Sequence, residues 1–594
     1  MTIKKTTTKI KTNWDLKLLY KSLEDPKIEE DVKILEKEYE KFAKKYSDKK
    51  YLQDKSILLR AISDYENLGK LKSPMYFFYF IQDLESKNKK AESLKNKYYQ
   101  RLTNLYNKAL FFTLSLSELD EKKEKELMSD ESLKKYRYFF HRLFITKKHN
   151  LKEGEEKIMK LKSQTSRTMW VEASDKLLNN KEILLKGKKY SPGEAVNRIK
   201  ESPLPDRYKL DKKLIEALKD CSHMAEAELN AIVTDKKISD ELRGYKKPYS
   251  ATVESYENEE VSVESLVSSV TKYFHVSNKF FDLKKCMMKL PVLKYADRAV
   301  AVGNVSKKIP FEKSVELVNR AFSSVDKEFS DILASFLQSG QIDVFPKIGK
   351  TGGAYCSSDI NRPTFVLLNY TESFDSIMTF AHEMGHAIHG ELSHKSQSPI
   401  YSDYTISVAE VASTLFENFA FEEISKELTE KEKTLALFNR IHDDIGTIFR
   451  QIACFNFELD MHNSIREKGY LPKEDLAKMM NKHMRAYLGK SFKLEDDDGY
   501  FFVYWSHIRN FFYVYSYAYG QLISKVLYKR YKENPAYIKN IKEFLSAGGS
   551  MSPEDIFKKC GLDTRDPKFF EEGLKSIEED VKNLEKMLKK QKMI

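Results

Sequence analysis

Two histidines four residues apart, His382 and His386, constrain the fold of this chain more than any other feature. An α-helix turns about 100° per residue, so side chains four apart lie one above the other on one face. Two imidazoles in that arrangement can bind one metal ion, and Glu383 between them is placed to act as a base. The stretch therefore predicts a helix that carries part of a zinc site.

The surrounding residues support a helix over about residues 373–392. Ser373 is a suitable N-cap, and apolar residues recur at helical spacing (Ile377, Phe380, Ala381, Met384 and Ile388). Gly385 is unfavourable inside a helix by about 1 kcal/mol relative to alanine, so we expect a packing reason for it. The alternative interpretation is a pair of surface histidines beside a solvated glutamate.

A catalytic zinc ion usually has three protein ligands and one open position, so a third ligand must come from outside the pair. His389, His394 and Glu410 are the nearest downstream candidates. The motif that uses a further histidine places it six residues after the second one, where this chain has Leu392. Glu410 is favoured because it lies in a second helix-compatible run with small residues. Glu417, two turns later on the same face, could hydrogen-bond a ligand imidazole.

The chain resembles the thimet oligopeptidase and oligoendopeptidase F superfamily of zinc peptidases, and most closely its oligoendopeptidase F branch. The resemblance covers nearly the whole chain, and its specific motifs lie within residues 340–520. The matching stretches are Trp14–Leu16 with Leu19–Tyr20, Gly349–Tyr355, Pro363–Tyr370, Phe380–His389, Ala409–Thr414 and His507–Ala518. One departure is Phe511, which stands where the branch commonly has proline, so a looser loop is expected there.

This resemblance implies that His382, His386 and Glu410 bind one zinc ion and that Glu383 is the catalytic base. It also implies a fold that is mainly α-helical, with two lobes around a deep central channel. The implied substrates are short unstructured peptides.

Residues 500–519, the aromatic block, are unusually rich in tyrosine. Peptide hydrolysis builds negative charge on the carbonyl oxygen, and phenol and imidazole donors can stabilise that charge. The resemblance assigns this role to His507 and Tyr515, with Tyr513 and Tyr517 as neighbours that contact substrate. The alternative is that these tyrosines are packing residues whose hydroxyl groups reach the surface.

Short β-favouring runs separated by Gly, Pro and Asn between residues 341 and 370 predict a small sheet before the zinc helix. An exposed edge of such a sheet can bind an extended peptide through main-chain hydrogen bonds. We expect Gly353, Ala354 and Tyr355 to form this edge, which would give broad specificity.

The length of 594 residues predicts at least two lobes. Residues 1–190 are expected to form an N-terminal helical lobe, because apolar residues recur at spacings of three and four, as in Val32, Leu35, Tyr39, Phe42 and Tyr46. Residues 191–594 are expected to form the catalytic domain, which ends in a packing helix with Leu574, Ile577, Val581, Leu584 and Leu588 on one face.

The net charge of +13 does not predict nucleic-acid binding. The excess is almost all lysine, mixed with acidic residues, and arginine is the residue preferred for recognising phosphates and bases. No membrane segment is expected, because His507, Arg509 and Asn510 interrupt the aromatic block. Five scattered cysteines and the absence of an apolar run after Met1–Thr8 favour a cytoplasmic location.

The prediction is a zinc-dependent oligopeptidase that cuts internal peptide bonds. Two alternatives remain open: a metallocarboxypeptidase of the same superfamily, and a peptide-binding homologue without catalytic activity.

Overall fold

The computed structural model describes residues 10–68, 74–303, 305 and 307–594. The first eight residues, on which the expectation of no secretory signal rests, lie outside the described part. The chain forms two compact units, each built from three segments. The first unit comprises Met1–Lys148, Ser306–Glu427 and Leu527–Cys560, and the second comprises His149–Val305, Leu428–Val526 and Gly561–Ile594.

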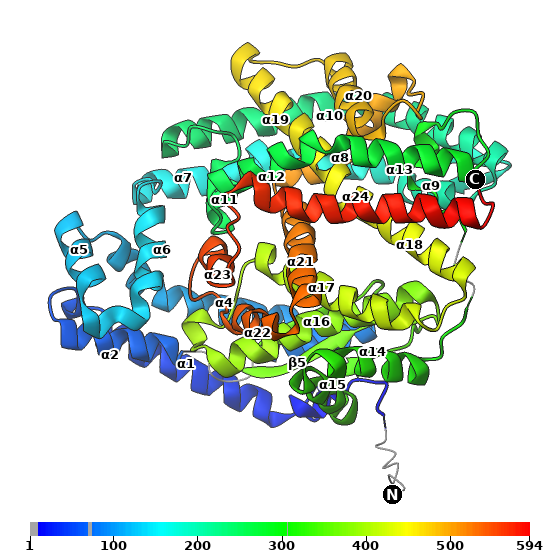
Figure 1. Ribbon diagram of the computed structural model, residues 1–594. Helices are drawn as coiled ribbons and strands as arrows, with labels where there is room; N and C mark the ends of the chain where they lie inside the picture. The colour runs from blue at the N-terminus through cyan, green and yellow to red at the C-terminus, as the bar shows by residue number, and fades with distance from the viewer. Residues whose placement is uncertain (1–9, 69–73, 304, 306) are drawn as a thin grey trace, which may run out of the picture. The chain divides into compact units, whose positions relative to one another are not determined.

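The first unit is mainly helical, as predicted (Figure 1). Its N-terminal helices are η1 (Leu16–Leu18), α1 (Pro26–Tyr46), η2 (Lys50–Leu52), α2 (Lys55–Glu66), α3 (Pro74–Leu84), α4 (Lys89–Ser117), α5 (Glu121–Ser129), η3 (Glu131–Tyr136) and α6 (Arg137–Lys147). Its later helices are α14 (Phe311–Val325), α15 (Lys327–Ser339), α16 (Phe374–Ser396), η6 (Pro399–Tyr401), α17 (Ile406–Ser425), η10 (Pro535–Tyr537), α22 (Ile538–Ser546) and α23 (Pro553–Lys559).

The second unit is also mainly helical. Its helices before residue 306 are α7 (Glu153–Ser163), η4 (Gln164–Thr168), α8 (Met169–Asn179), α9 (Pro192–Glu201), α10 (Leu204–Arg243), α11 (Ser250–Ser255), α12 (Glu260–Lys272), α13 (Phe274–Met287) and η5 (Tyr295–Ala299). The later ones are α18 (Glu430–Asp444), η7 (Ile445–Phe449), α19 (Arg450–Lys468), α20 (Lys473–Leu488), η8 (Asp496–Val503), η9 (Ser506–Asn510), α21 (Tyr515–Glu533) and α24 (Pro567–Lys590). Helix α21 extends past Val526 into the first unit.

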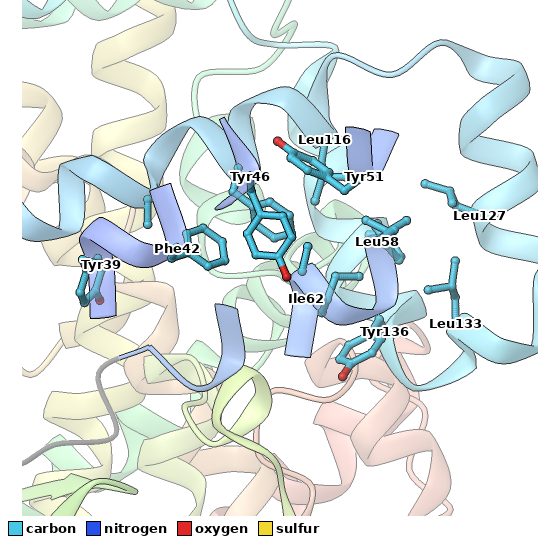
Figure 2. Packing of buried hydrophobic residues seen from close by; sticks show 14 of the residues in the cluster. Tyr39, Phe42, Tyr46, Tyr51, Leu58, Ile62, Leu116, Leu127, Leu133 and Tyr136 are labelled. Carbon is cyan, nitrogen blue, oxygen red and sulfur yellow. The ribbon is translucent and has the colours of Figure 1, made fainter. Parts of the chain in front are cut away.

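The apolar stripe predicted near the N-terminus is confirmed as the buried face of α1. Phe42 and Tyr46 pack with ring centroids 5.0 Å apart, and Tyr51 lies next to Tyr46 (Figure 2). Leu58, Ile62 and residues of α4 to α6 complete this core. The predicted C-terminal packing helix is confirmed as α24, in which all five apolar residues are buried.

Strands in the described residues form two small sheets. In the second unit β1 (Ile183–Leu185) pairs with β2 (Lys188–Tyr190). In the first unit, the predicted sheet is confirmed as β3 (Ile342–Asp343), β4 (Tyr355–Asp359) and β5 (Arg362–Leu367), in the order β3-β5-β4. Strand β4 is antiparallel to β5 and forms one edge. Both β4 and β5 contact α16, which follows them in the chain (Figure 1).

None of the described helices combines the length and apolar character needed to cross a bilayer. The boundary proposed at residue 190 and the deep central channel stay predictions.

Candidate metal centre

Helix α16 begins where the sequence predicts. Ser373 is its N-cap, and its hydroxyl oxygen accepts a hydrogen bond of 3.1 Å from the backbone N–H of Ser376. This bond satisfies one of the donors that every helix leaves free in its first turn. Three turns later, the imidazole centroids of His382 and His386 are 4.9 Å apart on the same face.

Helix α17 brings Glu410 to this histidine pair. The Oε2 atom of Glu410 is 3.7 Å from Nε2 of His382, and its Oε1 atom is 4.0 Å from Nε2 of His386. One possible ligand atom from each residue lies within 4.8 Å of the other two. Ser413, one turn along α17, donates a hydrogen bond of 3.2 Å to Oε2 of Glu410 and helps to orient it.

Glu417 contacts the other side of the His382 ring, where its carboxylate accepts a hydrogen bond from Nδ1. Burial lowers the pKa of His382, but the hydrogen bond and charge of Glu417 outweigh this effect and raise the pKa to about 9. The bond to Nδ1 leaves Nε2 facing Glu410, which is the orientation a metal ligand needs.

Glu383 is only 6% exposed, although it lies next to His382. Burial raises the pKa of its carboxyl group to about 7, so it can both accept and release a proton near neutral pH. The role of Glu383 as a base stays a prediction.

The two alternative histidines do not join the cluster, which within the described part of the chain consists of His382, His386 and Glu410. His389 is fully buried and stacks on Tyr404, with 3.7 Å between the ring centroids. Burial lowers the pKa of His389 to about 3, so this ring is neutral. It is a packing residue of the first unit.

The aromatic block lies in the second unit, over the end of η8, η9 and the start of α21. Tyr513 contacts Nδ1 of His507 through its hydroxyl group, and the hydroxyl of Tyr517 is 3.5 Å from that of Tyr513. These three side chains are half-buried. Tyr515 is fully buried instead, and its hydroxyl donates a hydrogen bond of 2.9 Å to Oδ1 of Asn258.

The turn at Phe511 is held in place, in contrast to the looser loop expected from the missing proline. Phe511 has φ of 40°, which the proline ring cannot adopt. The carbonyl oxygen of Phe511 accepts a hydrogen bond of 2.9 Å from Thr252, and the N–H of Phe512 donates one of 2.8 Å to the buried carboxyl group of Glu458. Sequence reasoning missed Glu458 and Asn258, because no local pattern marks a contact with Phe512 or Tyr515 that lies 54 or 257 positions away.

The predicted edge residues lie at the start of β4. Tyr355 is its first residue, opposite Leu367 of β5, and Gly353 and Ala354 precede it. The Tyr355 hydroxyl donates a hydrogen bond of 2.5 Å to Asp83, so this side chain is directed into the first unit. Its backbone remains part of an edge strand.

Comparison with known proteins gives the family. Residues 207–576 match Peptidase family M3, and residues 116–180 match the description Oligopeptidase F. The chain belongs to peptidase family M3. The predicted resemblance is confirmed, because the M3 match alone covers more than half of the chain.

Two related proteins align with most of this chain. The oligoendopeptidase F homolog of Lactococcus lactis subsp. lactis is 25% identical over 607 residues, which cover 98% of each chain. Oligopeptidase PepF of Bacillus subtilis is 25% identical over 521 residues, which cover 84% of this chain and 77% of that protein.

Solved structures show the same fold. A structure from Chlamydophila abortus has a TM-score of 0.84 at 22% identity and covers 97% of this M3 chain and 98% of its own. Oligoendopeptidase-F from Enterococcus faecium has a TM-score of 0.69 at 18% identity, with 95% and 99% covered. The mainly helical fold with small sheets is thus shared with these solved structures.

Proposed function

We propose that this chain is a zinc-dependent oligopeptidase that hydrolyses internal bonds of short unstructured peptides and uses one zinc ion per chain. The observation that carries the proposal is the convergence of His382, His386 and Glu410, whose ligand atoms lie within 4.8 Å of one another. The names of the Lactococcus and Bacillus relatives, an oligoendopeptidase and an oligopeptidase, support it.

The donor set fits zinc. Two imidazole nitrogens and one carboxylate oxygen are among the commonest ligands of catalytic zinc, and three protein ligands leave one position open. His382 is already oriented by Glu417, so little reorganisation is needed to bind the ion. When bound, zinc would supply Lewis-acid catalysis, which lowers the pKa of water and polarises a carbonyl group.

Glu383 would move the proton in this reaction. Its carboxylate would accept a proton from the attacking water and then deliver that proton to the departing amine. A pKa raised to about 7 by burial suits both steps, because the group is then neither too weak a base nor too weak an acid.

The donors for the developing negative charge would come from the aromatic block. His507 and Tyr513 are half-buried and contact each other, with Tyr517 adjacent. Tyr515, the tyrosine favoured by sequence, is fully buried and already bonded to Asn258. We therefore propose His507 with Tyr513 as the donors, and a supporting position for Tyr515.

Peptide binding would use the edge of β4. An extended peptide that pairs with this edge gains main-chain hydrogen bonds whatever its sequence. Gly353 has φ of 80° and open space around it, so the approach to the edge is not blocked by a side chain there. We propose that Gly353, Ala354 and Tyr355 contribute backbone to this contact, in a cytoplasmic enzyme.

The test is a mass-spectrometric analysis of a mixed pool of peptides of about ten residues, incubated with the zinc-loaded protein and with the chelated protein. Internal fragments that appear only with zinc are expected. Loss of single C-terminal residues would indicate a carboxypeptidase instead. If zinc-loaded protein produces no fragments, the proposed activity is wrong and a peptide-binding role replaces it.

A further inference from the structure

One cavity has all of its lining residues within the second unit. Its volume is about 560 Å³, and its lining residues come from α9, α13, η5, α18, η7, α19, α20, η8, η9 and the turn between η8 and η9. Among its lining residues are Lys200, Arg298, Arg450, Tyr504, Trp505 and His507. Its volume is within the range of cavities that hold small ligands or one to two residues of a peptide.

Arg450 is the unusual residue of this cavity. No hydrogen bond or ion pair joins its guanidinium group to any residue in the described part of the chain, and its Nε atom is buried without an acceptor. The side chain as a whole is partly exposed, but its Nε–H donor is buried, and a buried donor without an acceptor is costly. A ligand with a negatively charged acceptor would supply the missing hydrogen bond and an opposite charge.

The backbone before Arg450 is also unusual. Helices α18 and α19 are continuous through η7, a π-helical segment over Ile445–Phe449 that directly precedes Arg450. Such wide turns within helices are frequent at functional sites. Gly446, in this segment, lines the cavity, and a β-carbon placed on it would meet no atom within 4 Å. The π-helical segment therefore contributes open space beside the unpaired arginine.

The other charges of the cavity favour an anion. Lys200 and Arg298 are additional cations, and Asp443, which is exposed, is the one carboxylate among the lining residues that the structure describes. Arg298 lies over the rings of Tyr295 and Phe501, at 3.8 and 4.5 Å from their centroids. Asp211 and Asp498 interact electrostatically with Arg298 but do not line the cavity. The described lining residues thus include three cationic side chains (Lys200, Arg298 and Arg450) and one carboxylate (Asp443).

A second donor in the cavity wall is also without an acceptor. Trp505 is 3% exposed, and its indole Nε1 is buried without an acceptor among the described residues. His442 adds no charge, because burial lowers its pKa to about 3. Aromatic surface from Phe501, Tyr504 and Trp505 gives the cavity an apolar wall beside its cations.

We propose that this cavity binds a carboxylate of the peptide substrate, held by Arg450, with the adjacent side chain against the aromatic wall. An arginine fork matches the planar carboxylate and can donate two parallel hydrogen bonds to it. The inference rests on the proposed function, because His507, which lines the same cavity, is the residue that ties it to the reacting peptide. The carboxylate is either the free C-terminus or an acidic side chain.

Cleavage of matched peptides is the first test. We compare kcat/KM for one fluorogenic peptide as the C-terminal acid, as the C-terminal amide, and as the amide with one aspartate in place of an asparagine. The wild-type protein is expected to cleave one of the carboxylate peptides at least about tenfold faster than the neutral amide. Arg450→Met should reduce that ratio to near one and leave cleavage of the amide unchanged. Arg485→Met, which removes an exposed arginine of α20, is the matched control and should preserve the ratio.

Binding without catalysis is the second test. Trp505 lines the cavity, so its fluorescence reports occupancy, and Trp505→Phe identifies its part of the signal. We titrate N-acetyl-Leu-Phe, its amide, and N-acetyl-Asp-Phe amide into the zinc-free protein. A dissociation constant about tenfold lower for one of the two acids is expected, with the difference lost in Arg450→Met and in Gly446→Leu, which fills the open space.

The outcomes separate this inference from the proposed activity. If acid and amide peptides bind equally and are cleaved equally, the carboxylate site is wrong while the peptidase activity stands. If no peptide is cleaved but the acids still bind more tightly, the activity is wrong and the cavity is a carboxylate site of a binding protein. Gly446→Leu keeps the test valid should Arg450→Met fail to fold.

Discussion

Gly385 of α16 and Ser413 of α17 approach so closely that a β-carbon on Gly385 would lie 2.9 Å from the Cα atom of Ser413. The same β-carbon would be 3.2 Å from the carbonyl oxygen of Ala412, and backbone atoms cannot move aside as a flexible side chain can. This glycine therefore permits the helix contact that brings Glu410 to the two histidines. It explains a residue that is unfavourable inside a helix.

Gly385→Ala is expected to push α17 away from α16. The overpacking should destabilise the protein by about 1–3 kcal/mol and weaken zinc binding, because Glu410 moves with its helix. Thermal unfolding and zinc content after dialysis measure the two effects. Gly154→Ala, in α7, is the control, since a β-carbon there meets no atom within 4 Å. Equal zinc content and stability in both variants would contradict the packing role.

Glu383→Gln is expected to keep zinc and lose turnover. Glutamine preserves the shape of the side chain but cannot accept a proton, and general acid–base catalysis typically contributes about 100- to 10,000-fold. Steady-state cleavage of a quenched peptide, together with metal analysis, checks both parts. Turnover close to that of the wild type would rule out Glu383 as the base.

Glu417→Gln should weaken zinc binding by about 10- to 100-fold, because the amide replaces the charged acceptor that orients His382 through Nδ1. Competition with a chromophoric chelator measures the affinity. Glu422→Gln is a matched control on the same helix, as Glu422 pairs with Lys532 on the surface. Equal zinc affinities of the two variants would contradict the role of Glu417 in orienting His382.

Tyr513→Phe is expected to lower the turnover rate, whereas Tyr515→Phe is expected to lower the stability. Loss of the Tyr513 hydroxyl should lower kcat by about 100-fold or more, because a donor to the developing charge is removed. Loss of the buried Tyr515 hydroxyl removes its hydrogen bond to Asn258 and should cost about 1–3 kcal/mol of stability with little change in kcat. Kinetics and chemical denaturation separate the two effects. The reverse result would restore the catalytic role that the family resemblance implies for Tyr515.

Lys284 makes the stability of the second unit depend on pH. Burial lowers its pKa to about 7, whereas an unfolded lysine titrates near about 10.4. Between these values the unfolded chain binds more protons, so stability rises with pH by at most about 1.4 kcal/mol per unit. Lys284→Met should lack this rise, and its stability relative to wild type should therefore decrease from pH 7 to 9. If the curves of unfolding free energy against pH for wild type and Lys284→Met are parallel, Lys284 is not the source of this pH dependence.

Several features could be predicted because they depend on neighbouring residues. The start of α16 at Ser373, the buried stripe of α1 and the short strands before α16 follow from capping and from hydrophobic periodicity. Glu410 was favoured over His389 from the sequence, and the packing of α16 against α17 brings it to the two histidines. The burial of Tyr515 could not be predicted, because its partner Asn258 lies 257 positions away.

The sequence by itself determined that this chain is a mainly helical member of a peptidase family, with two histidines and a glutamate on one helix. Those properties arise within a few turns of a helix or from stretches long enough to match relatives. Only the tertiary structure decided which tyrosines are half-buried, which glycine lets two helices meet, and which arginine lines a cavity without a partner. These depend on contacts between segments distant in the chain, and no local pattern of residues encodes them.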